Sequence, residues 1–351
     1  MVEPVSLIPV SNPPNPFIPE TMEYLDDIPP EERRAVLQVY EDHTRTILAS
    51  NDSPDVGFNF SVNPYRGCYH ACAYCYARPT HEYLGFGAGT DFERKITIKP
   101  KAAELLREAF EAKRWKGELV VFSGVTDCYQ PLEASYRLTR GCLEVCAEYR
   151  NPVGIITKSP LVERDIDVLR ELHRVARVGV TLSIPIWSKE KARAVEPGVA
   201  TPARRIETIR KLAAAGLSVG VNVAPLIPGL GDEGMVEVLE AASAAGATRA
   251  GFVMLRLPGS VRAVFLERLQ RDLPLQADKI VSRIKEVRGG KLYDPRFGTR
   301  GTGEGVYADA VHALFAATTK RLGMNGETWP EVPMTFSRPR ERRQLGLFSS
   351  P

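Results

Sequence analysis

The sequence lacks any apolar run close to the roughly 20 residues that a membrane-spanning helix needs. Residues 1–19 also lack a basic stretch followed by an apolar one, which is the pattern of a secretory signal. These absences argue against a membrane protein or a secreted one, and we expect a cytoplasmic protein. Cysteine is scarce, at six residues, and in such a protein cysteines are more often metal ligands, catalytic thiols or core residues than disulfides.

A strong excess of charge is also missing, because the 351 residues carry a net charge of only +3. The charge is uneven, since residues 1–55 hold eleven acids and three bases, which leaves a basic remainder. A basic body is compatible with a nucleic-acid partner, although an ordinary surface with scattered Lys and Arg explains it equally well. The content of 44% hydrophobic and 25% charged residues is typical of a soluble globular protein.

The composition divides the chain into four regions. Residues 1–55 form a Pro-rich acidic extension, in which the pattern over 29–50 predicts one helix. Residues 56–258 carry alternating strand and helix patterns, and residues 259–327 carry helical patterns alone. Residues 328–351 form a polar, basic tail.

Short runs rich in β-branched residues alternate with amphipathic stretches, which is typical of βα units around a parallel sheet. We expect strands at 58–62, 119–125, 153–157, 179–184, 218–224 and 250–255. We expect helices at 100–114, 134–149, 161–175, 202–215, 233–245, 260–271, 276–287 and 305–322. Ligands of such sheets gather at the carboxyl ends of the strands.

Three cysteines lie close together in the sequence NPYRGCYHACAYCYAR, just after the first expected strand. Cys68, Cys72 and Cys75 have the spacing C-x3-C-x2-C. Three thiolates can hold three irons of a 4Fe-4S cubane and leave the fourth iron open to a ligand. A zinc site completed by His70 or His81 is an alternative, but it needs a ligand at a less usual spacing.

This motif, with an aromatic residue before its last cysteine and βα repeats after it, resembles the radical S-adenosylmethionine (radical SAM) superfamily. The triplet Tyr74-Cys75-Tyr76 is similar, more narrowly, to spore photoproduct lyase and its homologues in non-sporulating bacteria. The resemblance implies an α/β fold, a partial (β/α)6 TIM-like barrel with N- and C-terminal extensions. It also implies a [4Fe-4S] cluster and S-adenosylmethionine as cofactors, cleaved to a 5′-deoxyadenosyl radical with an electron from a donor such as flavodoxin or ferredoxin.

Polar residues that follow the expected strands supply hydroxyls, backbone donors and charges suited to an aminoacyl group and a nucleoside. By the resemblance, Tyr74 lies near the adenine and the loop after the second strand binds the amine. The residues that we expect to bind the cofactor are Tyr74, Ser123, Gly124, Asp127, Lys158, Ser159, Ser183, Asn222 and Gly229. Asp127 could instead face the substrate, and Lys158 and Ser159 could simply begin a helix. Arg204 and Arg205 could bind a carboxylate or phosphate, or lie exposed on a helix.

The other cysteines form a looser group. In spore photoproduct lyase a cysteine near the second strand donates a hydrogen atom to the substrate radical, but here the thiol is displaced by several positions to Cys128. We still expect Cys128 to be the donor, because an S–H bond is weak, with Tyr76 and Tyr129 as relays. Cys142 and Cys146 are four apart on an expected helix, and we expect both to be small core residues.

The basic tail carries a short apolar motif, QLGLF, formed by Gln344, Leu345, Gly346, Leu347 and Phe348. Peptides of this kind insert a few apolar anchors into a groove. The motif resembles the Gln-Leu-x-Leu-Phe sequence by which bacterial polymerases and repair proteins bind the sliding clamp. The alternative is that its apolar residues cover the barrel.

Together these features predict a radical SAM enzyme that abstracts hydrogen from a nucleic acid, in the first place a lyase-type repair enzyme for a DNA lesion. One alternative is a radical enzyme that modifies RNA or a peptide. Another is a metal-containing DNA-binding module without catalysis.

Overall fold

A seven-stranded sheet forms the centre of the protein in the computed structural model, which describes residues 37–326 and 334–339. Its strand order is β10-β9-β8-β7-β6-β3-β2. Six strands are parallel and follow chain order: β3 (Phe60–Val62), β6 (Val120–Phe122), β7 (Val153–Thr157), β8 (Val178–Ser183), β9 (Ser218–Leu226) and β10 (Arg249–Met254). The seventh strand, β2 (Leu48–Ser50), pairs antiparallel with β3.

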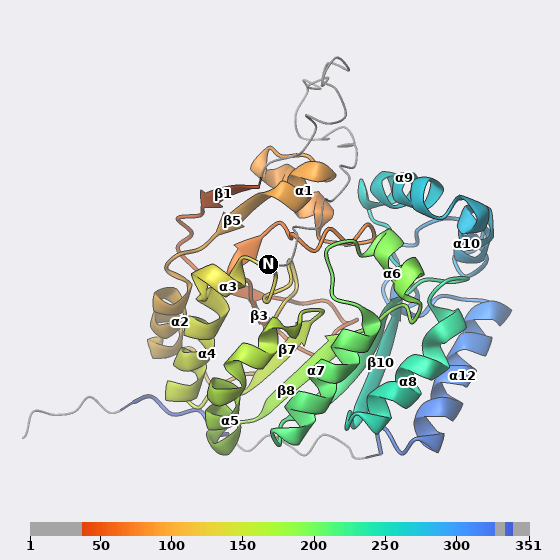
Figure 1. Cartoon of the computed structure of the whole chain (residues 1–351). Helices are drawn as coiled ribbons and strands as arrows, with labels where there is room; N and C mark the ends of the chain where they lie inside the picture. Colours follow the sequence, from red (N-terminus) through yellow and green to blue (C-terminus); the bar gives the residue numbers. More distant parts are fainter. Residues whose placement is uncertain (1–36, 327–333, 340–351) are drawn as a thin grey trace, which may run out of the picture.

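Helices cover one face of this sheet (Figure 1). They are α2 (Ala102–Glu111), α3 (Glu133–Tyr136), α4 (Leu138–Glu148), α5 (Ile166–Val175), α7 (Pro202–Ala214), α8 (Met235–Ala244) and α12 (Val306–Arg321). The strands alternate accordingly: Val178, Val180 and Leu182 are buried against the helices, while Gly179 and Thr181 are only half-buried on the opposite face. The apolar side chains between sheet and helices form the main core.

All six expected strands are present, and their order agrees with the expected partial (β/α)6 barrel. Within the described residues β10 pairs only with β9 and β2 only with β3, so the sheet has no closing pair there. The gap is bridged by side chains instead. Asp55 accepts the backbone N–H of Gly298 (2.9 Å) and is ion-paired with Arg300, which also donates to Ser53 Oγ (2.9 Å).

A smaller three-stranded sheet lies beyond the carboxyl ends of the main strands, at the top of Figure 1. Its order is β1-β5-β4, formed by β1 (Gln38–Glu41), β4 (Tyr65–Arg66) and β5 (Lys95–Ile98). The short elements near it are η1 (Arg78–Leu84) and α1 (Thr90–Arg94). Further elements are η2 (Pro160–Asp165) after β7, α6 (Lys189–Val195) after β8, η3 (Asp232–Gly234) after β9, and α9 (Val261–Asp272), α10 (Pro274–Glu286) and α11 (Thr299–Thr302) after β10.

The helix expected over 29–50 is wrong for its described part, 37–50, which contains β1 and β2. β1 pairs parallel with β5, and β2 pairs antiparallel with β3. Val39 and Tyr40 suit a strand as well as a helix, so the available pairing partners decide the outcome. Helical periodicity alone could not reveal these partners, which lie far along the chain.

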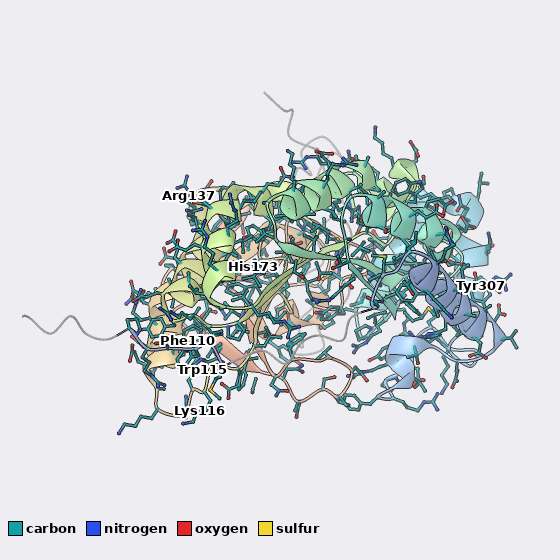
Figure 2. All side chains as sticks on the ribbon, turned by 90° about the horizontal axis from the view of Figure 1, so that it is seen from below. Phe110, Trp115, Lys116, Arg137, His173 and Tyr307 are labelled. Atoms are coloured by element: carbon teal, nitrogen blue, oxygen red, sulfur yellow. The ribbon has the colours of Figure 1, made fainter. Side chains whose placement is uncertain are left out.

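Residues 334–339 pack against the first βα unit. The ring of Phe336 lies against Phe110 and Tyr149, with centroid separations of 5.9 and 6.2 Å. Phe110 stacks on Trp115, and both are labelled in Figure 2, which views the molecule from below. Arg338 donates to the backbone carbonyls of Phe110, Ala112 and Trp115 at the carboxyl end of α2. No helix in the described part of the chain is long and apolar enough to cross a membrane.

Candidate active site

The three clustered cysteines lie in a tight loop between β4 and η1. Backbone hydrogen bonds from Ala71 to Cys68 and from Cys75 to Cys72 turn the chain twice within eight residues. Gly67 has a φ of +75°, and an added Cβ would lie 3.0 Å from the carbonyl oxygen of Phe92, so glycine is required at this position. The loop therefore brings three thiols together at the carboxyl end of the barrel.

Arg78, three residues after the last cysteine, anchors this loop from inside. Its side chain is fully buried, and it donates to the carbonyl of Cys72 through two nitrogens (2.9 and 3.0 Å) and to the carbonyl of Ala88 (2.8 Å). The buried carboxylate of Glu93 balances its charge, at 2.6 Å. A buried guanidinium with this many partners fixes the geometry of the loop.

The three thiols lie close enough together for the charge on one to change the pKa of another. Burial would raise the pKa of Cys68, but the neighbouring imidazole of His70 lowers it below the usual value. Burial raises the pKa of Cys72 and Cys75, and the charge on Cys68 raises both further. Thiolates that repel one another are stabilised by iron cations, so this donor set fits an iron–sulfur cluster.

The alternative of a single zinc ion gains no support. It needs His70 or His81 as a fourth ligand, and His70 Nδ1 lies 3.3 Å from a carboxylate oxygen of Asp127. His81 is packed against the rings of Phe86 and Phe92 instead, with centroid separations of 5.2 and 5.5 Å.

The loop after β6 holds the cysteine loop in place. Thr126 donates from its hydroxyl to the carbonyl of Gly67 (2.8 Å). Gln130 donates to the same carbonyl (3.2 Å) and accepts the N–H of Tyr69 (3.0 Å). Both polar side chains are buried, so these bonds are shielded from water.

Asp127 connects three loops. One carboxylate oxygen lies 3.3 Å from His70 Nδ1 and accepts the N–H of Lys158 (2.8 Å), and the other accepts the hydroxyl of Thr157 (2.6 Å). Burial would raise the pKa of Asp127, but His70 and these hydrogen bonds lower it to about 2. Both oxygens are thus engaged within the protein, which favours a positioning role over the expected ligand-binding role.

Tyr74 is held by a buried ion pair between Glu196, which the sequence did not single out, and Arg205, which it did. Its hydroxyl donates to Glu196, which is also ion-paired with Arg205 (2.7 Å). Arg205 donates in addition to the carbonyl of Ser183 (2.6 Å). Lys158 Nζ lies 5.7 Å from the centre of the Tyr74 ring. The segment of Glu196 also bonds the cysteine loop through its backbone, since Ala73 donates to Val195 (2.9 Å).

The expected cofactor residues fall into two groups. Ser123, Gly124, Lys158 and Asn222 are half-buried at the mouth or on the inner face of the sheet, where a ligand can reach them. Ser159 accepts the N–H of Leu161 and so begins η2, as its alternative interpretation held.

Two further residues of this set are engaged by the protein. The carbonyl of Ser183 accepts a hydrogen bond from Arg205. Gly229 has a left-handed backbone (φ +79°) and packs against Arg283 of α10. Arg204 is ion-paired with Glu163, so neither Arg204 nor Arg205 is a free cation.

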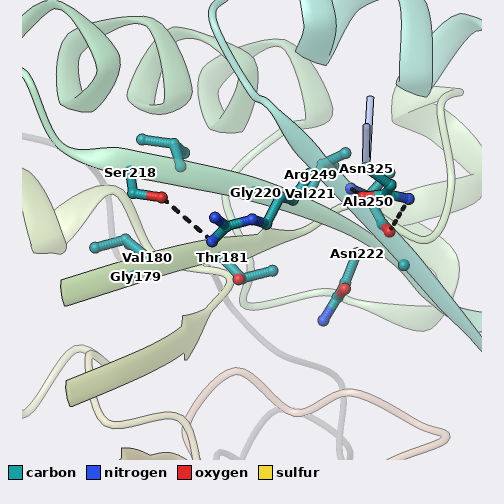
Figure 3. A pocket seen from close by; sticks show the side chains of 12 residues that line it. Gly179, Val180, Thr181, Ser218, Gly220, Val221, Asn222, Arg249, Ala250 and Asn325 are labelled. Atoms are coloured by element: carbon teal, nitrogen blue, oxygen red, sulfur yellow. Dashed lines mark hydrogen bonds between the residues drawn. The ribbon is translucent and has the colours of Figure 1, made fainter. Parts of the chain in front are cut away.

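Asn222 lines a cavity of about 200 Å³ on the inner face of β8, β9 and β10 (Figure 3). Gly179, Gly220 and Gly251 leave this face bare, and a Cβ on Gly251 would lie 2.8 Å from Asn222 Oδ1. Arg249 crosses the cavity toward Ser218 Oγ (3.5 Å). Among the residues that the structure describes, no side chains fill this hollow beside β8, β9 and β10.

The three candidate hydrogen donors lie in different surroundings. Cys128 and Tyr129 are fully buried, and Cys128 Sγ lies 3.6 Å from Ser123 Oγ. Tyr76 is 54% exposed, and its hydroxyl donates to the carbonyl of Gly124.

The remaining two cysteines, Cys142 and Cys146, lie in the main core on α4, where we expected them as small core residues. Burial raises the pKa of both thiols. The QLGLF motif, with Gln344, Leu345, Leu347 and Phe348, lies outside the described residues.

The fold and the cysteine loop define a class of iron–sulfur enzymes that use S-adenosylmethionine. The model of the Radical SAM superfamily matches residues 62–242, and the chain belongs to this superfamily. Members of the superfamily use a [4Fe-4S] cluster and S-adenosylmethionine, and this chain has the matching thiol set.

Relatives in sequence do not carry an assigned activity. An uncharacterised protein of Mycobacterium tuberculosis is 39% identical over 243 residues, 68% of this chain and 70% of that protein. An uncharacterised protein of Methanocaldococcus jannaschii is 30% identical over 176 residues, 50% of this chain and 63% of that protein.

Among solved structures, the fold is similar to that of spore photoproduct lyase. The complex of that enzyme with a dinucleoside spore photoproduct has a TM-score of 0.51 and 18% identity, over 81% of this chain and 78% of that one. At this level of identity the similarity establishes the fold.

We predict that changing Cys68, Cys72 or Cys75 singly to Ala abolishes both the visible absorbance of the cluster and S-adenosylmethionine cleavage, because two thiolates cannot hold the cubane. Iron and sulfide analysis after anaerobic reconstitution measures the first effect. Cys146→Ala is the matched control and should keep its iron, and iron loss in that variant would point to a second metal site.

Proposed function

We propose that this protein starts radical chemistry on a nucleic acid, and that its substrate is a lesion in DNA. The proposal rests chiefly on Tyr76, an exposed aromatic residue that directly follows the third cysteine and bonds the loop after β6. An aromatic ring at the mouth of a buried cofactor site is suited to stacking on a base. The likeness to a fold that binds a dinucleoside spore photoproduct supports the same substrate class.

Cys68, Cys72 and Cys75 would hold the cluster, which when bound would supply the electron for reductive cleavage of S-adenosylmethionine to methionine and a 5′-deoxyadenosyl radical. The electron comes from an external donor, which we expect to be a flavodoxin or ferredoxin. The residues of this chain have the tasks of holding the cofactor, excluding water and placing one substrate hydrogen beside the radical.

Lys158 is the cation best placed to bind the cofactor carboxylate. Burial would lower the pKa of Lys158, but nearby Cys72, Glu196 and Asp127 raise it, so the ammonium stays charged. Its backbone N–H is fixed by Asp127, and its ammonium lies over Tyr74. Ser123 and Gly124, with left-handed or extended backbone, offer groups for the amine on the other side.

Buried polar groups that bond one another help to keep water out of the site. Glu196, Arg205 and Tyr74 are each nearly or fully buried and bond one another. A reactive carbon radical would otherwise abstract hydrogen from stray donors, so a rigid, dry wall protects the reaction.

The proposed substrate class is tested by 5′-deoxyadenosine formation under anaerobic, reducing conditions. We expect irradiated DNA to raise the rate well above that with undamaged DNA, RNA or a peptide, because only the correct substrate places a hydrogen beside the radical. Cys72→Ala is the control for cluster-independent cleavage. Stimulation by RNA or peptide alone would support the alternative radical enzymes, and no cleavage under any condition would support the non-catalytic DNA-binding module.

For the hydrogen donor, the geometry favours Tyr76 over Cys128. Cys128 is enclosed behind Ser123, and Tyr129 is buried in the core, whereas Tyr76 faces the mouth. In this proposal the O–H hydrogen atom of Tyr76 moves to the substrate carbon. The tyrosyl radical that remains is reduced by the external electron donor with uptake of a proton.

We therefore expect Tyr76→Phe to cleave S-adenosylmethionine but to give altered products, because the variant keeps the ring and lacks the donor hydrogen. Product analysis by mass spectrometry with isotopically labelled substrate measures this. Tyr129→Phe is the matched control and should give normal product. Normal product from Tyr76→Phe and altered product from Cys128→Ala would return the role to the thiol.

The tail supplies a second proposal, binding of the bacterial sliding clamp by Gln344, Leu345, Leu347 and Phe348. The described segment before it is held by Arg338 and Phe336 at the carboxyl end of α2, on the side opposite the cysteine loop. A clamp bound by the tail would raise the local concentration of DNA.

A double change of Leu347 and Phe348 to Ala should abolish clamp binding, because the apolar anchors are lost, while 5′-deoxyadenosine formation stays unchanged. Titration with purified clamp at micromolar concentrations measures the affinity. Val306→Ala, at a highly exposed valine of α12, is a control for apolar truncation elsewhere on the surface. If the intact protein does not bind the clamp, the remaining interpretation is that the apolar residues of the motif cover the barrel.

A further inference from the structure

Arg256 is a cation at the mouth of the barrel that the mechanism above does not use. It follows β10 by two residues, and its neighbours Leu255 and Leu257 are buried in the second apolar cluster. Because side chains of an extended chain alternate, Arg256 faces the other way, toward the mouth. It is half-buried, and its Nε is shielded from solvent without a hydrogen-bond partner in the described part of the chain.

The groups around Arg256 leave it without a counter-ion. Asp55 is close enough to feel its charge, but that carboxylate is already engaged by Arg300 and by the N–H of Gly298. Arg288, a second cation nearby, donates to the carbonyls of Leu255 (2.6 Å), Thr299 and Arg300. Within the described residues, no carboxylate lies in ion-pair distance of Arg256, and the cation Arg288 stands next to it.

Two exposed aromatic rings accompany this cation. Tyr76 is 54% exposed, and the positive charge of Arg256 acts to lower its pKa. Phe297 is 59% exposed. The guanidinium of Arg300 lies 3.9 Å from the centre of the Phe297 ring and holds it beside the Asp55 bridge. Single-stranded nucleic acids bind to groups of this kind, with phosphate on an unpaired cation and bases on exposed aromatic rings.

We propose that Arg256 binds a phosphodiester of the substrate strand and that Phe297 stacks a neighbouring base, so that the reacting nucleotide is presented at Tyr76. This inference rests on the proposed function, because it names how that substrate is held. It assigns a substrate-binding role to the edge between β10 and the Asp55 segment, where the described residues form no closing strand pair.

The test is the salt dependence of nucleic-acid binding by the reconstituted protein with S-adenosylmethionine present. Arg256→Gln should weaken binding about tenfold through loss of a charge-assisted bond. The slope of log K against log salt should fall by about 0.7 for a single strand or about 0.9 for a duplex, the value for one phosphate. Irradiated DNA and RNA of the same sequence serve as separate probes, since both carry the phosphodiester.

Arg262→Gln is the matched control, because it removes the same charge from an exposed position of α9 six residues away. It should leave affinity and slope nearly unchanged. Phe297→Ala should weaken binding without changing the slope, since stacking releases no counter-ions. Arg256→Lys keeps the charge and should retain the slope. The change of slope in Arg256→Gln can then be assigned to the lost charge and not to misfolding.

Each other outcome has a definite meaning. An unchanged slope in Arg256→Gln would overturn the phosphate contact while leaving the proposed function intact. Loss of S-adenosylmethionine affinity in that variant would place Arg256 in the cofactor site instead. Failure of the wild-type protein to bind either nucleic acid would overturn the proposed substrate class itself.

Discussion

The carboxylate of Asp127 is the interaction on which the rest of the site depends. It joins the cysteine loop through His70, its own loop after β6, and the start of the segment after β7 through Thr157 and Lys158. Parallel strands end at the same edge of the sheet, so three loops that are distant in sequence must be brought into register there. One buried anion with partners from each loop does this, and its removal would leave a buried imidazole and several donors unpaired.

The barrel and the thiol set could be predicted from the sequence because their signals are local. Runs such as residues 153–157 identify a strand by composition, and C-x3-C-x2-C needs only spacing. The strands β1, β2 and β5 could not be predicted, because they are short and their stability comes from partners elsewhere in the chain. The roles of Arg78 and Glu196 were missed for a similar reason, since a sequence does not show that a charged residue is buried beside its counter-ion.

Buried charge is used here in two different ways. Arg78 is paired with Glu93, and Arg205 with Glu196, and each arginine also donates to backbone carbonyls, so these pairs fix loops. Lys158 lies near anionic groups of the site, whereas Arg256 has no ion-paired carboxylate among the described residues. The partners of each charged side chain therefore distinguish residues that hold the fold from residues that can bind a ligand. The net charge of the chain does not make this distinction.

The packing of residues 334–339 on α2 has a consequence for how the chain reaches its native state. Arg338 donates to the carbonyl of Phe110, 228 positions earlier, and Phe336 completes an aromatic cluster with Phe110 and Tyr149. A growing chain therefore exposes the apolar surface of Phe110 and Tyr149 until residue 338 has been synthesised. Contacts between residues so far apart in the sequence form slowly. Until they form, this apolar surface is open to chaperones and to aggregation.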